Sequence, residues 1–150
     1  MTVKAQLRLQ GPMDHLRVVW QAGEALLESV PFRNDPDGTR YNVLLAVQEM
    51  VTNVIRHGYH GDEDQPILVE FAADGEGMWI EIRDRGPAFN PAHVSVCPPG
   101  GDSVPRAEGG YGIMITRTVM DEFDYAREGD WNVLRMFKSA VAVSETAQKV

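Results

Sequence analysis

Three polar residues in this chain are spaced by four: Glu49, Asn53 and His57. On a helix, that spacing places them along one stripe. The residues beside the stripe are apolar, namely Met50, Val51, Val54 and Ile55. A carboxylate and an amide beside an apolar surface need partners, because an unpaired buried polar group costs about 1–3 kcal/mol. Their oxygens suit Mg²⁺, which keeps most of its waters and takes few protein ligands. By itself, the stripe is better explained as the solvated edge of an amphipathic helix.

A second chemical feature is the aspartate that ends the apolar run MWIEIRD. Asp84 is followed by small residues, including Gly86 and Ala88. The carboxylate can accept a hydrogen bond from an amino group, and the small residues let the backbone approach a flat ligand closely. Taken alone, Asp84 is equally explained as the start of a turn, where aspartates are common.

Glycines lead directly into a predicted helix in the run EGGYGI, residues 108–113. Backbone N–H groups at a helix N-terminus attract anions, and Gly109, Gly110 and Gly112 would let a phosphate come close. The run is not a P-loop, because no Gly-Lys-Ser/Thr follows, and it lacks the Rossmann spacing. A flexible loop that ends at a helix explains it as well.

The elements that must position these residues follow from hydrophobic periodicity and from turn residues. Strands are predicted at 3–9, 67–73, 78–83, 123–127 and 132–137, and helices at 12–30, 39–59 and 111–120. Thr39 is the expected cap of the long helix. Residues 74–77 read as a hairpin turn, 84–110 as a long loop, and about 139–150 as a frayed tail. We expect one domain over residues 1–150, an α+β two-layer sandwich with a mixed, mostly antiparallel sheet and helices on one face.

Composition excludes several classes of function. The net charge is −8 and the 14 Lys and Arg residues form no run, which argues against binding to nucleic acid or to a membrane surface. No apolar run approaches the roughly 20 residues that span a bilayer, and the N-terminus does not resemble a signal peptide. The single cysteine, Cys97, excludes an internal disulfide and fits a reducing compartment. We therefore expect a cytoplasmic protein.

Considered together, the three motifs are more specific than any one of them. The runs EMVTNVIRHGY, IEIRDRGPAFNP and EGGYGIMI resemble, in this order, the N box, G1 box and G2 box of the GHKL ATPases, which share the Bergerat fold. Within that family the chain is most similar to the bacterial anti-sigma-factor serine kinases. The resemblance covers about residues 44–136.

The resemblance implies a role for each matching residue. Asn53 would hold Mg²⁺, and Asp84 would accept from the adenine amino group of ATP. Gly86 and Ala88 would border the ring, and His57 would be a packed structural residue. The residues implied at the phosphates are Gly109, Gly110, Gly112, Arg56 and Arg106, although each arginine is also explained as a solvated side chain. Glu49 would be the general base that takes a proton from the attacking hydroxyl.

The family's threonine beside the adenine is replaced here, with Asn132 or Val133 in its place. The resemblance further implies an anti-sigma factor with serine/threonine kinase activity towards a STAS-type anti-anti-sigma protein, acting as a homodimer. Two other functions stay open. One is a non-catalytic ATP-binding module that sequesters a partner, and the other is a free-standing ATPase.

Overall fold

The computed structural model describes residues 1–91 and 110–141. Helices α1, α2 and α3 span His15–Leu27, Pro36–Asn53 and Gly110–Val119, and a π-helix, η1, continues α2 over Val54–Gly58. Strands β1 to β5 span Val3–Leu9, Ile67–Ala73, Gly77–Asp84, Glu122–Glu128 and Trp131–Ser139. Within these residues, no helix is long and apolar enough to cross a membrane.

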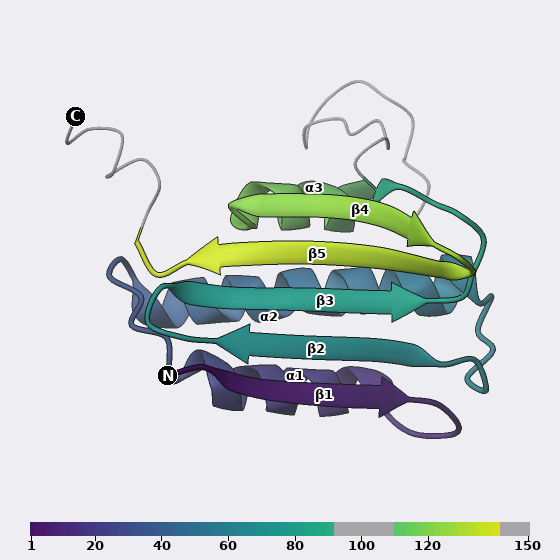
Figure 1. Ribbon diagram of the computed structural model, residues 1–150, viewed down its shortest axis with the longest axis horizontal. Helices are drawn as coiled ribbons and strands as arrows, with labels where there is room; N and C mark the ends of the chain where they lie inside the picture. Colours follow the sequence, from purple (N-terminus) through teal and green to yellow (C-terminus); the bar gives the residue numbers. More distant parts are fainter. Residues whose placement is uncertain (92–109, 142–150) are drawn as a thin grey trace.

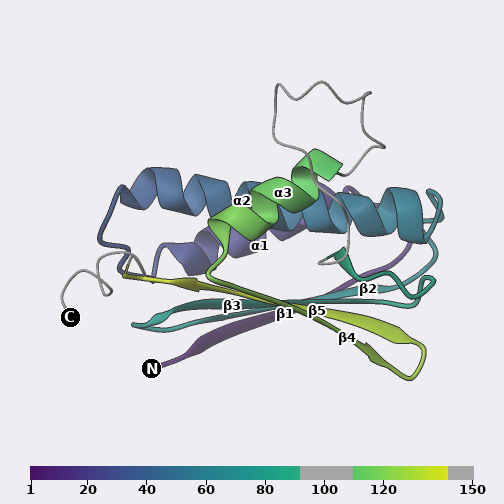
Figure 2. The ribbon, with the colours of Figure 1, turned by 90° about the horizontal axis from the view of Figure 1, so that it is seen from above.

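The strands form one sheet in the order β1-β2-β3-β5-β4 (Figure 1). The three α-helices lie together on one face of this sheet, so the molecule has two layers (Figure 2). The predicted α+β sandwich is confirmed with one correction. Each pairing between the described strands is antiparallel, so the sheet is not mixed. β5 returns from its hairpin with β4 to lie beside β3, and this return gives it the direction opposite to both neighbours.

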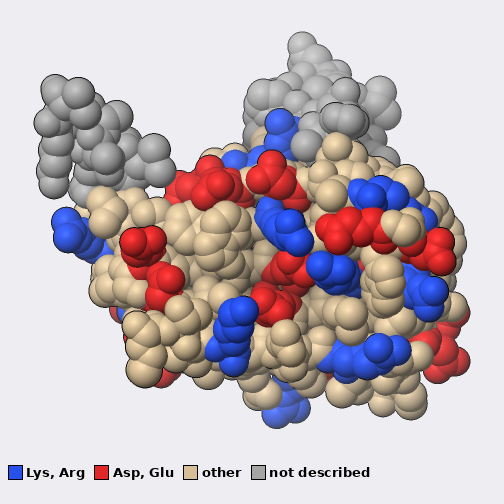
Figure 3. All heavy atoms as spheres, viewed as in Figure 1, with Lys and Arg blue, Asp and Glu red and all other residues tan. Residues whose placement is uncertain are grey.

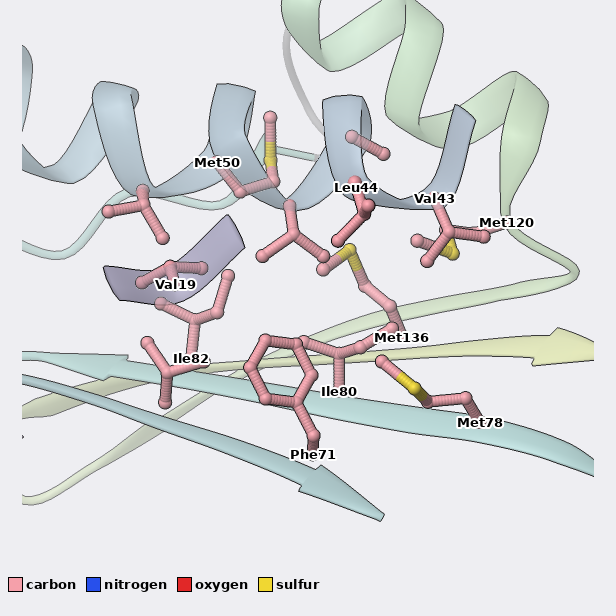
Figure 4. Packing of buried hydrophobic residues seen from close by; sticks show 14 of the residues in the cluster. Val19, Val43, Leu44, Met50, Phe71, Met78, Ile80, Ile82, Met120 and Met136 are labelled. Atoms are coloured by element: carbon pink, nitrogen blue, oxygen red, sulfur yellow. The ribbon is translucent and has the colours of Figure 1, made fainter. Parts of the chain in front are cut away.

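The core lies between the helices and the inward face of the sheet. Burial alternates along β2, where Ile67, Val69, Phe71 and Ala73 are buried and the residues between them are partly exposed. Figure 4 shows Phe71 and other sheet residues packed against side chains from α2. Burial of each such side chain contributes about 1.5–3 kcal/mol. The helix layer is therefore held firmly over the sheet, and this fixes α2 relative to the end of β3.

The opposite face of the sheet carries charges of both signs (Figure 3). Glu81 lies between Arg83 and Arg135 and accepts a hydrogen bond from each, with Arg135 Nε 2.8 Å from Glu81 Oε2. Burial alone would raise the pKa of Glu81, but these two hydrogen bonds lower it below its usual value. Because these ion pairs are exposed to solvent, screening by water and salt keeps their contribution to stability small. On this face, acidic and basic side chains neutralise each other locally.

The start of α2 differs from the sequence prediction, which placed it at residue 39. α2 begins at Pro36, and its N-cap is Asp35, whose side chain accepts from Gly38 N at 3.3 Å. Thr39 already lies inside the helix and donates its hydroxyl to Asn34 O at 3.0 Å, so it is not the cap. Proline suits the first helical turn because its missing N–H has no partner there in any case.

The chain also stays ordered past the point where fraying was expected. β5 runs to Ser139, and Ala140 is buried. Ala140 N donates to Glu76 O at 2.8 Å, and its carbonyl accepts from Arg33 N at 3.1 Å. The prediction of a frayed tail from about residue 139 is therefore wrong as far as Ala140, while residues 142–150 lie outside the described part of the chain.

Candidate functional site

A pocket of about 190 Å³ lies between the end of α2, the π-helix η1 and the end of the central strand β3. Two of the predicted site residues from distant parts of the chain, Asn53 and Asp84, both line it, together with Ala88. The remaining lining residues are mostly apolar: Met50, Val54, His57, Gly58, Ile82, Pro87, Phe89, Pro91, Tyr125, Asn132 and Leu134. A largely apolar cleft with a few convergent polar groups is the usual form of a small-molecule site.

The π-helix η1 brings the end of the long helix against the turn that follows β3. A side chain on Gly86 would place its Cβ 3.1 Å from both Gly58 Cα and Gly58 O, and 3.0 Å from Asp84 Oδ1. The backbones of the two segments therefore approach each other closely here, at a backbone crossing where a side chain on Gly86 would have no room. Short π-helical turns are frequent at functional sites. In this chain the turn positions the carboxylate at the pocket.

The side chain of Tyr59, the residue after η1, stabilises this close approach through two hydrogen bonds. Its hydroxyl donates to Pro66 O and accepts from Arg85 N, each at 2.6 Å. Burial has the largest effect and raises the pKa of Tyr59; the hydrogen bond from Arg85 N lowers it in part, and the negative charge of Asp84 raises it again, so the net pKa is raised. The phenol thus stays protonated and serves as a fixed link between η1 and the residue after Asp84.

We expect Tyr59→Phe to lower the free energy of unfolding by about 1–3 kcal/mol, because it leaves a backbone N–H and a carbonyl without their buried partner. Chemical unfolding in urea measures this loss. A raised pKa in the folded state means that the contribution is complete below pH 10 and is lost as pH rises through the folded pKa. The stability difference between the two proteins should therefore shrink at alkaline pH. A difference that stayed constant would contradict this role for the hydroxyl.

Asp84 is buried, with 7% of its surface exposed, and its carboxylate is held on one side. Asp84 Oδ1 accepts from Gly86 N at 2.9 Å and from Asn132 Nδ2 at 3.0 Å. Within the described residues, both hydrogen bonds to this carboxylate fall on Oδ1, which leaves Oδ2 for a ligand in the pocket. A buried carboxylate oxygen of this kind accepts strongly from an amino group.

Asn53 carries an unsatisfied buried atom. Within the described residues, its amide nitrogen is buried without a hydrogen-bond partner. Such an atom costs about 1–3 kcal/mol in the free protein. This unpartnered donor fits a ligand that offers an acceptor atom, such as a phosphate oxygen. The carboxamide oxygen of the same side chain is a suitable Mg²⁺ ligand. Within the described residues, no three or more His, Cys, Asp or Glu side chains are grouped so that they could hold a metal ion. A metal at Asn53 would therefore need further oxygen ligands from a bound small molecule and from water.

Glu49 lies one helical turn before Asn53, and its half-buried carboxylate faces the first turn of α3. A Cβ on Gly112 would lie 2.5 Å from Glu49 Oε2 and 3.1 Å from Glu49 Cβ. The Thr116 hydroxyl lies 2.8 Å from Gly112 O within α3 and 3.3 Å from Ala46 O in α2, and the second of these contacts links the two helices. The structure thus brings Glu49 to the glycine-rich helix start.

The other predicted residues have different positions. Gly110 begins α3, as expected of a glycine that leads into a helix. Arg56 is exposed and does not line the pocket as described. His57 is exposed and does line it, so the prediction of a packed structural histidine is wrong. Arg106, Gly109 and Cys97 lie outside the described residues.

Sequence reasoning missed one wall of the site entirely. Tyr125 and Phe89 line the pocket without having been predicted. Asn132 was predicted only as one of two alternatives to the family's threonine. The strand register decides between them, because Asp84 pairs with Asn132 while Val133 pairs with Arg83 and points to the other face. The signal available in the sequence was the alternation of β5, which places Asn132, Leu134 and Met136 on one side.

Residues 13–138 match the family model described as the histidine kinase-like ATPase domain, which is most of the chain. The chain belongs to this family. Its curated relatives include the serine-protein kinase RsbW of Listeria monocytogenes, which is 27% identical over 111 residues and 71% of each chain. Another relative is an anti-sigma F factor of Clostridium perfringens, 27% identical over 59% of this chain and 64% of that protein. The predicted resemblance is confirmed.

A solved structure shows the same fold for this ATPase domain. The crystal structure of the RsbU and RsbW domains of a Mycobacterium tuberculosis protein superposes with a TM-score of 0.60. The likeness covers 90% of this chain and 32% of that one at 15% sequence identity. At that identity, the comparison supports the arrangement of sheet and helices described above.

Proposed function

We propose that this chain binds ATP and Mg²⁺ and acts as a protein serine/threonine kinase and anti-sigma factor. The observation that carries the proposal is that Asp84, at the end of β3, and Asn53, at the end of α2, line one pocket. Glu49 lies outside this lining, one helical turn before Asn53, and faces the start of α3. A nucleotide has an amino-bearing base, a polyphosphate and a reacting end, and these three groups match those parts in order.

The pocket suits the base. Met50, Ile82 and Leu134 would provide apolar walls for a flat ring, and Asp84 would accept from an exocyclic amino group through Oδ2, since its Oδ1 already accepts from Gly86 N and Asn132 Nδ2. Ala88 borders the same space, while Gly86 permits the backbone crossing beneath it. Adenine presents such an amino group, whereas guanine and hypoxanthine carry an oxygen at that position. The carboxylate would therefore select ATP.

The phosphates would lie towards the start of α3. The first backbone N–H groups of a helix have no partner within it, so those near Gly110 and Gly112 favour an anion. Family resemblance adds Gly109, Arg56 and Arg106 as contacts. Asn53 would hold Mg²⁺, which when bound would neutralise charge on the phosphate oxygens.

Glu49 is the proposed general base. Its carboxylate lies against Gly112, beside the helix start that would face the terminal phosphate. From there it can take the proton from a seryl hydroxyl as that oxygen attacks phosphorus. The rest of the chemistry is positioning and charge neutralisation, which the other groups supply.

Two of the relatives are named serine-protein kinase and anti-sigma F factor, and these names support a protein substrate and a sigma factor as partners. We propose that the substrate is a STAS-type anti-anti-sigma protein with an acceptor serine or threonine. The unphosphorylated partner would compete with a sigma factor for this chain, which would act as a homodimer in the cytoplasm. The mixed charges on the open sheet face offer no basic surface for nucleic acid there (Figure 3).

Incubation with γ-labelled ATP, Mg²⁺ and a purified anti-anti-sigma protein from the same host tests this function. We expect acid-stable label on the partner, since phosphoserine survives acid and phosphohistidine does not. Phosphate release that is independent of the partner would instead indicate a free-standing ATPase. ATP binding without either product would indicate a non-catalytic module.

A further inference from the structure

The amide of Asn132 connects two segments at the base side of the pocket. Asn132 is 7% exposed and lies directly opposite Asp84 in the pairing of β3 with β5. Its Nδ2 donates to Asp84 Oδ1 at 3.0 Å, and also reaches Gly86 O at 3.2 Å and Pro87 O at 3.0 Å. One amino group therefore holds both the base-reading carboxylate and the turn that follows it.

The other end of the amide is held equally firmly. Asn132 Oδ1 accepts from the Tyr125 hydroxyl at 2.5 Å and from Arg127 Nη1 at 3.1 Å. The same Arg127 nitrogen donates to Gly86 O at 2.8 Å. The β4–β5 hairpin is thus tied to the turn after β3 at several points.

These partners determine which way the amide points. The reverse orientation would set Asn132 Oδ1 against a carboxylate and two carbonyl oxygens, and would set its amino group against a guanidinium. Both atoms are also fully used, because Nδ2 has two hydrogens for three acceptors and Oδ1 has two donors for its two lone pairs. Asn132 therefore has no free hydrogen-bonding group to offer a ligand.

Its effect must then pass through Asp84. With Oδ1 engaged by Asn132 and by Gly86 N, the carboxylate cannot rotate to exchange its oxygens without breaking two buried hydrogen bonds. We propose that Asn132 is a positioning residue that sets base selectivity by locking Asp84 with Oδ2 towards the pocket. This inference rests on the proposed ATP binding, and it assigns the selectivity to the β4–β5 hairpin as well as to β3.

The test compares the dissociation constants of ATP and ITP, measured by calorimetry with Mg²⁺ present. ITP has an oxygen where ATP has the amino group, so it loses the hydrogen bond to Asp84 while keeping the ribose and phosphates. We expect the unmodified protein to prefer ATP by roughly 10- to 100-fold, the value of one charge-assisted hydrogen bond. In Asn132→Leu, the ATP affinity should fall and the ITP affinity should stay within about threefold, so that the preference approaches 1.

Two further variants keep the result decisive. Tyr125→Phe removes one hydroxyl that holds the amide and should reduce the preference by a smaller factor, about threefold. If Asn132→Leu does not fold, the ATP preference of Tyr125→Phe tests the proposed role of Asn132 in its place. Arg135→Gln changes a residue on the same strand that faces the opposite side of the sheet, and should leave both constants unchanged.

A purely structural role predicts a different result. If the variants at Asn132 and Tyr125 lost ATP and ITP affinity equally, the preference would be unchanged and the assignment would be overturned. A failure of the unmodified protein to bind any nucleotide would instead contradict the proposed function, and this inference with it.

Discussion

Glu49→Gln should bind ATP within about threefold of the unmodified protein, yet transfer phosphate to the partner about 10²–10⁴-fold more slowly. Glutamine keeps the size of the side chain but cannot take a proton at neutral pH. Glu49 does not line the base pocket, so its loss should not disturb the contacts there. Calorimetry measures the binding, and single-turnover transfer of labelled phosphate measures the chemistry.

Gly112 provides a second way to displace the same carboxylate. In Gly112→Ala the new Cβ would meet Glu49 Oε2 and Cβ, so the base must move while staying chemically intact. We expect transfer to fall, and we expect the shorter side chain of Glu49→Asp to restore part of it when the two changes are combined. Loss of all ATP binding in Glu49→Gln would contradict the separation of binding from chemistry.

Asn53→Ala should lose at least about 100-fold in turnover, since a divalent cation contributes several kcal/mol to stabilising charge in the transition state. The binding of ATP to the unmodified protein should strengthen when Mg²⁺ replaces EDTA, whereas the variant should bind equally weakly in both. Calorimetry under the two conditions separates a metal ligand from a residue that contacts the base.

The free energy of unfolding of Asn53→Ala without nucleotide gives a second, independent test of whether Asn53 binds a ligand or has a structural role. Because the Asn53 amide nitrogen is buried without a partner in the described residues, its removal should not lower the free energy of unfolding. Asn42→Ala is a matched control, since it makes the same change at an exposed position of the same helix. Unchanged turnover in Asn53→Ala, or a large loss of stability, would show that Asn53 has a structural role instead.

The sequence alone determined most of the elements and the identity of the principal polar groups. Alternation in ILVEFAA predicted β2 to the residue, because burial on one face of a strand is a local pattern. Spacing by four placed Glu49 and Asn53 on one stripe of α2, and the glycines before α3 marked its start. These features depend on near neighbours along the chain.

The tertiary structure decided how those groups meet. The register of β3 against β5 places Asn132 beside Asp84, and the π-turn η1 sets Gly58 against Gly86. Tyr59 reaches Arg85 across the same crossing. No local pattern encodes these contacts, because each joins segments that come together only when the core packs.

The same reason explains the errors at the ends of elements and on η1. Asp35 rather than Thr39 caps α2, and the His57 side chain is exposed. Both outcomes depend on the segments that pack around the ends of the helix, and not on the periodicity within it. The motif residues were therefore readable from the sequence, while the hydrogen bonds that aim Asp84 and the packing that aims Glu49 came only from long-range contacts. Short-range periodicity sets which face a side chain occupies, and only the packing of distant segments sets what it touches there.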